Sequence, residues 1–161
     1  MAPRPVPLTM YGTPAMHEEL SWEWVVGQLM SAGTYWVVPR ARDGPPHPRP
    51  VWGIWRDDEL LLSIGSPVLR RELGADPVVT VHLDSGTDVV VVEGTASVAD
   101  GSDVIAGFVD HYDPKYDWSY DLSELGAPTR VTPNTVIAYR ATGWAGRDGF
   151  QQSAKWVFQT A

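Results

Sequence analysis

The 161-residue sequence contains no cysteine, which excludes disulfides, thiolate metal sites and a cysteine nucleophile. Basic side chains are scarce, with 12 lysines and arginines against 20 acidic residues. This balance argues against a nucleic-acid partner, because phosphate backbones are bound by clustered cations. No run approaches the roughly 20 apolar residues that a membrane span requires, so no membrane partner is expected. Residues 1–16 hold four prolines and no apolar core, so they do not form a signal peptide and we expect a cytoplasmic protein.

Recognisable catalytic motifs are also missing. The sequence has no glycine-rich phosphate loop, nucleophile elbow or paired-histidine zinc helix. The four histidines are far apart, and a metal site needs three or four converging ligands, so no metal is expected. Asp113, Asp117 and Asp121 have no neighbour that would raise a carboxyl pKa, and we interpret them as a solvated acidic loop. No catalytic side chain is therefore predicted.

The composition is that of one globular domain, with 43% hydrophobic and 20% charged residues. A chain of this length usually forms one domain with its own core. Residues 1–16 are proline-rich and lack a period, which predicts a flexible N-terminal arm followed by a single domain over residues 17–161. Eight tryptophans against three phenylalanines are unusual, and indoles suit cores, interfaces and stacking surfaces.

The spacing of apolar residues predicts a mainly β chain with peripheral helices. One helix follows Ser21, which can cap it, a short one covers residues 66–75, and another covers residues 103–112. Residues 113–132 are expected to be irregular, because Pro114 disfavours a helix there. Strands are predicted at residues 34–40, 49–55, 59–64, 78–83, 88–98, 135–141 and 155–159. Short polar turns between successive strands favour a closed or nearly closed antiparallel barrel.

The order of motifs in residues 44–96 is that of a known family. The run PHPRPVWGIW precedes ELLLSI, then LRRELGADPVVTVHL, then DVVVVEGTA. In this order the chain resembles the pyridoxamine 5′-phosphate oxidase-like split-barrel superfamily, which includes FMN enzymes and enzymes that use the deazaflavin coenzyme F-420. An early YW pair, a KY pair after the second long helix and a C-terminal KWVF extend the resemblance over most of the chain after residue 16. It implies a homodimeric antiparallel split β-barrel of six to seven strands.

In this superfamily a flavin lies in a groove at the dimer interface, with its phosphate held by basic side chains. Guanidinium groups and a helix N-terminus suit a phosphate because they stabilise its charge. The resemblance implies cofactor contacts by Arg49, Pro50, Val51, Trp52, Ser63, Ile64, Gly65, Arg70, Arg71 and Trp156. Trp52 and Trp55 face opposite sides of a strand, so at most one lines the groove, and we predict Trp52. Tyr35 and Arg49 are candidates for polar groups near the substrate.

The chain departs from the superfamily pattern where the phosphate is held. Ile54 replaces a basic residue of the flavin oxidases, and Val68 and Leu69 stand where they have an Arg-Lys pair. Arg70 and Arg71 either take over that role or are solvated charges on a short helix. The arginine-rich C-terminal motif that contacts pyridoxal phosphate is not evident, so vitamin B6 metabolism is not expected.

The resemblance favours an FMN- or F-420-dependent oxidoreductase that transfers a hydride to or from a small organic substrate. The cofactor would supply the chemistry, which agrees with the lack of a catalytic acid or base. The alternative is a cofactor-free split-barrel binding protein that has lost the phosphate clamp. Since fold alone does not decide function, both remain open at this point.

Overall fold

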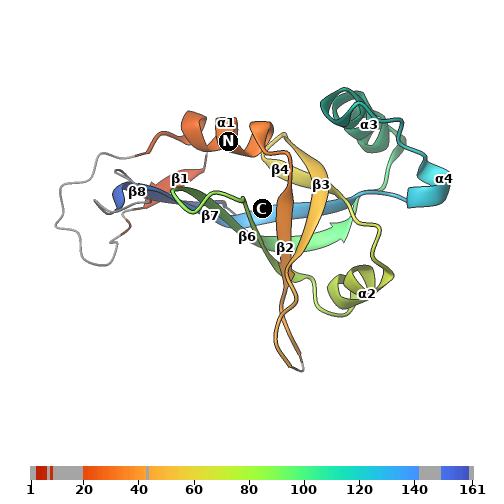
Figure 1. Cartoon of the computed structure of the whole chain (residues 1–161), viewed down its shortest axis with the longest axis horizontal. Helices are drawn as coiled ribbons and strands as arrows, with labels where there is room; N and C mark the ends of the chain where they lie inside the picture. The colour runs from red at the N-terminus through yellow and green to blue at the C-terminus, as the bar shows by residue number, and fades with distance from the viewer. Residues whose placement is uncertain (1–2, 7, 9–19, 43, 142–149, 160–161) are drawn as a thin grey trace.

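The structure, a computed structural model, describes residues 3–6, 8, 20–42, 44–141 and 150–159 (Figure 1). Its strands are β1 (Arg4–Val6), β2 (Tyr35–Pro39), β3 (Arg49–Arg56), β4 (Glu59–Ser63), β5 (Val78–His82), β6 (Asp88–Val98), β7 (Thr129–Ala141) and β8 (Phe150–Val157). Its helices are α1 (Trp22–Ser31), α2 (Pro67–Ala75), α3 (Ser102–Tyr116) and α4 (Leu122–Leu125). No helix in these ranges is long and apolar enough to cross a membrane.

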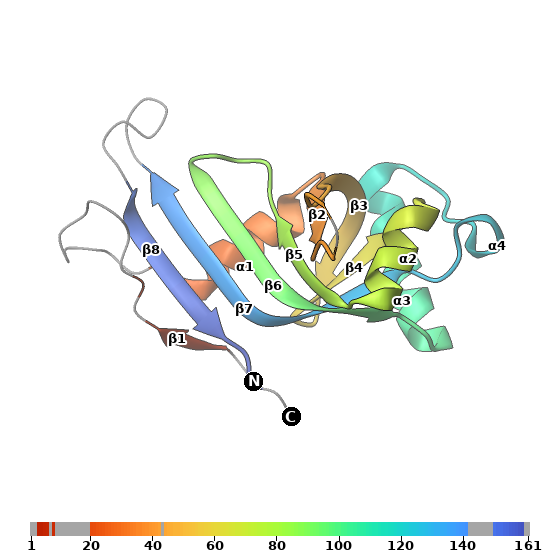
Figure 2. The ribbon, with the colours of Figure 1, turned by 90° about the horizontal axis from the view of Figure 1, so that it is seen from below.

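Strands β2 to β7 close into an antiparallel barrel. Their order is β7-β4-β3-β2-β5-β6, and β6 pairs back onto β7. The sheet continues beyond β7 through β8 to β1 (Figure 2). The β6–β7 pair runs from Asp88 opposite Arg140 to Val98 opposite Thr129. The predicted mainly β, antiparallel split barrel is therefore confirmed.

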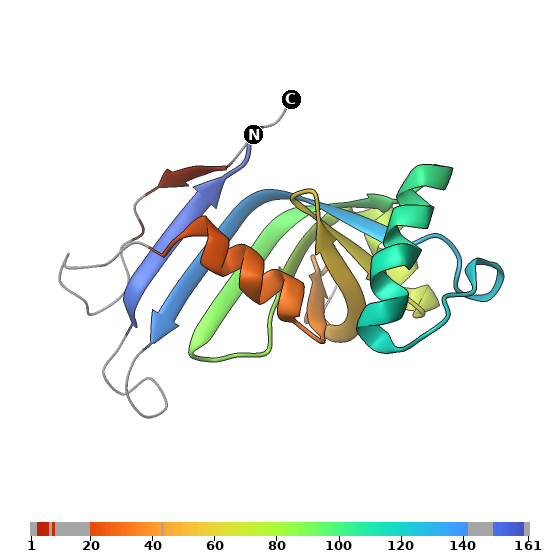
Figure 3. The same cartoon turned by 90° about the horizontal axis from the view of Figure 1, so that it is seen from above.

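Side-chain alternation on β4 divides the apolar residues between two clusters. Leu60 and Leu62 point into the barrel and are fully buried, whereas Leu61 joins a separate cluster with Phe108 and Tyr112 of α3. Helix α1 lies across the sheet (Figure 3) and adds its buried residues to the barrel core. Helix α3 covers the other cluster, which also includes Ile54 of β3.

Three local features differ from the sequence-based expectations. Arg4–Val6, inside the predicted arm, form β1 and pair with β8, while residues 1–2, 7 and 9–16 of that arm lie outside the described residues. The expectation that irregular structure begins at residue 113 is wrong, because α3 continues to Tyr116. Pro114 lies in the last turn of α3, where it removes a single backbone donor. Strand β7 begins at Thr129, before the predicted start at residue 135.

Candidate functional site

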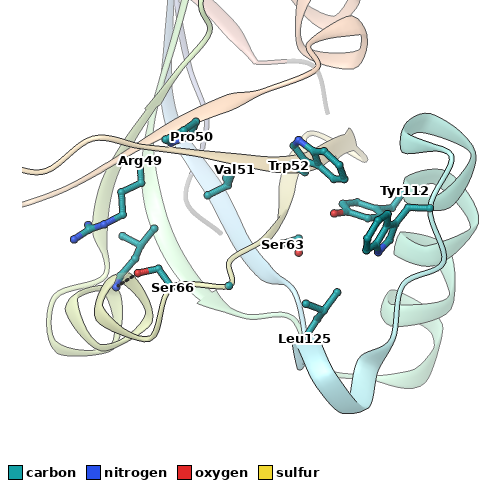
Figure 4. A pocket seen from close by; sticks show the side chains of 11 residues that line it. Arg49, Pro50, Val51, Trp52, Ser63, Ser66, Tyr112 and Leu125 are labelled. Atoms are coloured by element: carbon teal, nitrogen blue, oxygen red, sulfur yellow. Dashed lines mark hydrogen bonds between the residues drawn. The ribbon is translucent and has the colours of Figure 1, made fainter.

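A pocket of about 420 Å³ opens between β3, the end of β4, the first turn of α2 and the α3–α4 segment (Figure 4). This volume is in the range of small-molecule sites. We call it the aromatic pocket. It is lined by Arg49, Pro50, Val51, Trp52, Ser63, Gly65, Ser66, Leu69, Tyr112, Trp118 and Leu125.

One side of the aromatic pocket is a wall of stacked rings. Trp52 lies parallel to Tyr116, with ring centroids 4.6 Å apart and an interplanar angle of 2°. Trp118 meets Trp52 edge to face at 6.1 Å, and Tyr112 lies 6.5 Å from it. Trp52 and Trp118 remain 42% and 53% exposed, whereas Trp55 is buried in the barrel core. The wall therefore offers open indole surface on which a planar ligand can stack.

The opposite side carries the positive end of α2 and one guanidinium group (Figure 4). Ser66 caps α2, and its Oγ accepts a hydrogen bond of 3.3 Å from the Leu69 N–H. Arg49 Nη1 donates to Glu72 Oε2 at 2.9 Å and to the His47 carbonyl at 3.2 Å. A helix N-terminus and an arginine can attract an anion, but this arginine is already paired.

Hydroxyl groups gather around Ser63, which lines the pocket. The phenols of Tyr112 and Tyr120 lie near it, and the Tyr120 hydroxyl donates to the Gly126 carbonyl at 2.9 Å. Burial raises the pKa of both tyrosines. Both phenols therefore stay protonated at neutral pH and serve as hydrogen-bonding groups rather than bases.

The aromatic wall depends on a break in the barrel next to Trp52. Strand β3 pairs with β2 only through residues 49–51, and continued register would place Gly33 opposite Gly53. The Tyr116 hydroxyl occupies that position instead. It accepts from the Gly53 N–H at 3.0 Å and lies 2.9 and 3.1 Å from the carbonyl oxygens of Gly53 and Gly33. A tyrosine side chain thus satisfies the backbone groups that a β2 residue would otherwise pair.

Lys115 also binds at this break between β2 and β3, which we call the strand junction. Its Nζ donates to the Tyr35 hydroxyl at 3.0 Å and to the Gly53 carbonyl at 2.9 Å. The Tyr35 hydroxyl in turn donates to the Leu29 carbonyl at 2.6 Å. Burial lowers the pKa of Lys115 to about 8, and burial raises the pKa of Tyr35. These bonds fix the last turn of α3, and with it the ring on which Trp52 stacks.

The structure brings six of the ten predicted cofactor residues together. The residues that line the aromatic pocket are Arg49, Pro50, Val51, Trp52, Ser63 and Gly65. Their contact with a cofactor stays a prediction. Tyr35, proposed near the substrate, is fully buried in the core instead.

The other four predicted residues lie elsewhere. Ile64 is 1% exposed and Trp156 is 3% exposed, and both belong to the barrel core. Arg70 donates to the carbonyl oxygens of Ile64 and Leu125, so it ties α2 to α4. Arg71 lines a different cleft, beside the β2–β3 connection.

Five pocket residues were missed by sequence reasoning. They are Ser66, Leu69, Tyr112, Trp118 and Leu125. The density of aromatic residues in the run HYDPKYDWSY was the available signal for an aromatic wall. Because these residues were interpreted as part of an irregular acidic loop, the aromatic wall was not predicted.

The sequence matches no protein-family model and no curated protein. Several solved structures share the fold. A conserved hypothetical protein of Mycobacterium tuberculosis is 17% identical with a TM-score of 0.63, over 89% of this chain and 88% of that one. A FAD-binding protein of Mesorhizobium loti is 19% identical with a TM-score of 0.55, over 86% and 96%. A Clostridium acetobutylicum protein related to general stress protein 26, of the pyridoxinephosphate oxidase family, is 13% identical with a TM-score of 0.55, over 73% and 85%. This chain therefore has the split-barrel fold of the pyridoxamine 5′-phosphate oxidase-like proteins.

Proposed function

We propose that this protein binds a flavin or deazaflavin, FMN or coenzyme F-420, in the aromatic pocket and transfers a hydride to or from a small organic substrate. The observation that carries the proposal is the open indole surface of Trp52 facing the positive end of α2 across the pocket. Two proteins with the same fold, from Mesorhizobium loti and Mycobacterium smegmatis, are described as FAD-binding. When bound, the ring system would supply the redox chemistry.

The residues of this chain would position the ring and exclude water. Trp52 and Trp118 offer stacking surface, and Leu125 supplies apolar contact. The Ser63 hydroxyl can hydrogen-bond the polar edge of the ring. Within the described residues, the lining contains no carboxylate and no histidine, so a substrate that needs no proton from the protein fits best.

The charges around the pocket also support a second candidate, a binding protein for an uncharged planar molecule. Arg49 is paired with Glu72, and Arg70 is engaged by two backbone carbonyls. Among the residues described here, the pocket lining therefore includes no arginine that is free to meet a phosphate. A ligand without an anionic group would not need one.

Homodimerisation is part of the proposal. Trp118, Leu122 and Val68, on the segments around the pocket, are 53%, 44% and 40% exposed, and a second copy could bury them. Light scattering should give the mass of two chains. A mass of one chain at micromolar concentration would contradict this expectation.

Titration with riboflavin, FMN and F-420, followed by tryptophan fluorescence and ligand absorption, tests the proposal. Trp52→Ala should raise the Kd about tenfold, because stacking contributes on the order of 1 kcal/mol. Trp36→Ala is the matched control, since Trp36 stacks on His82 outside the pocket. If no ring binds at micromolar concentration, the proposal fails. Turnover of the reduced cofactor with a quinone acceptor separates an oxidoreductase from a simple binding protein.

A further inference from the structure

A separate pocket of about 340 Å³ lies between α2, the end of β6 and the connection from α4 to β7. We call it the Arg70 pocket. Its volume is in the range of small-molecule sites. Its lining is apolar except for Arg70, Ser97 and Thr129, and it shares no lining residue with the aromatic pocket. No step of the proposed function uses it.

The guanidinium group of Arg70 is held in place beside this pocket. Its Nε donates to the Ile64 carbonyl at 2.5 Å, and its Nη2 donates to the Leu125 carbonyl. Gly126 allows the group to lie against the backbone, because a Cβ at that position would be 3.2 Å from Nη1. The fold therefore fixes the position of this charge before any ligand arrives.

Arg70 keeps N–H groups that a ligand could use. Among the residues that the structure describes, its Nη1 has no hydrogen-bond or ion-pair partner. The carboxylates of α2 and of its C-terminal cap do not neutralise it, since Glu72 is paired with Arg49 and Asp76 with Arg40. A guanidinium nitrogen with free N–H groups is a strong partner for a carboxylate.

The remaining lining favours an apolar body on that ligand and a single negative charge. Leu73 and Ala96 are 6% and 8% exposed and belong to the barrel core, whereas Val98 at the end of β6 is 68% exposed. An apolar chain laid against Val98 would remove that surface from water. Within the described part of the chain, Arg70 is the one charged side chain of the lining, so a doubly charged phosphate would lack a second cation.

We propose that the Arg70 pocket binds a small monocarboxylic acid with an apolar chain or ring. The carboxylate accepts hydrogen bonds from Arg70, and the apolar body lies along Leu73, Ala96 and Val98. This site does not depend on the proposed function, because the aromatic pocket is built from other residues.

Calorimetric titration with octanoate and with its uncharged analogue octanamide tests the site. The wild-type protein should bind octanoate at least about tenfold more tightly than octanamide, because hydrogen bonds between charged groups are strong. Arg70→Gln should remove this preference. Arg71→Gln is the matched control, since it removes the same charge from the next residue of α2, which does not line the pocket, and it should keep the preference.

Val98 supplies a test that does not depend on the structural role of Arg70. Its side chain is exposed, so both Val98→Lys and Val98→Asp should fold. The lysine variant should bind octanoate more tightly than the wild type and the aspartate variant more weakly, and loss of structure would not produce two opposite changes.

Methyl NMR spectra locate the bound acid. Octanoate should shift the methyl signals of Leu73, Ala96 and Val98, and riboflavin should not displace it. Equal affinities for octanoate and octanamide, no binding at millimolar concentration, or a preference that survives in Arg70→Gln would each overturn the assignment. Methyl shifts confined to residues of the aromatic pocket would overturn it too. None of these results bears on flavin binding, which the ring titrations test separately.

Discussion

Replacing Lys115 by methionine tests the junction that supports the aromatic wall. Methionine keeps the apolar stem of lysine and removes the ammonium group. Both oxygen atoms that lose a donor keep another partner: the Gly53 carbonyl still has the Tyr116 hydroxyl at 2.9 Å, and the Tyr35 hydroxyl still donates to Leu29. The variant is therefore expected to fold.

The size of the effect follows from the pKa of Lys115, which burial lowers from 10.5 to about 8. Below about pH 8 both the folded and the unfolded protein are protonated at this site, and the folded state carries the full desolvation penalty. Between the two pKa values the unfolded state binds more protons, so stability rises with pH. From about pH 7 to about pH 9.5 the rise is about 2 kcal/mol, or about 1 kcal/mol if solvent screening halves it.

Urea unfolding of the wild type and of Lys115→Met over this pH range measures the effect. The free energy of unfolding of the wild type should rise relative to that of the variant as the pH increases. Tyrosine ionisation occurs in both proteins and cancels in the difference. Lys155→Met, which removes the other lysine of the chain, is the control. The free energy of unfolding of the wild type minus that of Lys155→Met should not change with pH. A wild-type-minus-variant difference that does not change with pH would refute the reasoning.

Two further predictions concern the same strand junction. Tyr116→Phe should lower the free energy of unfolding in urea by about 1–3 kcal/mol, because the Gly53 N–H and the Gly33 carbonyl lose their partner; a loss below about 0.5 kcal/mol would contradict this. Gly53→Ala should destabilise by about 1–3 kcal/mol, because a Cβ there would lie 2.6 Å from the Leu62 side chain. Gly27→Ala, in α1 with nothing within 4 Å of the new Cβ, should stabilise the same protein by about 0.5–1 kcal/mol. Equal effects at the two glycines would show that the close approach at Gly53 is unimportant.

The barrel was predictable because its signals are local. Each strand carries its own alternation, as in the buried Leu60 and Leu62 on either side of Leu61. The opposite orientation of Trp52 and Trp55 follows from the same period of two. Strand β1 gave no such signal, because three residues that contain a proline are too few to show a period.

Of the residues that line the aromatic pocket, the sequence predicted only those on the strands and directly after β4. Arg49 to Trp52 are consecutive on β3, which the sequence predicted as a strand, and all four line the pocket. Trp118 comes directly after the end of α3, which continues through Pro114, and the hydrogen bonds of Lys115 hold that last turn in place. Those bonds join residues that are distant in sequence, so no local sequence pattern predicts them.

The surroundings of the Arg70 and Arg71 side chains could not be predicted from the sequence, because they depend on how α2 is rotated about its axis. Successive residues on a helix differ in direction by about 100°, so the rotation of α2 decides which surroundings each arginine meets. The rotation is set by burial of Leu69 and Leu73, which are 0% and 6% exposed. With those two leucines against the barrel, Arg70 meets the carbonyls of Ile64 and Leu125. Arg71, the next residue, lines the different cleft beside the β2–β3 connection.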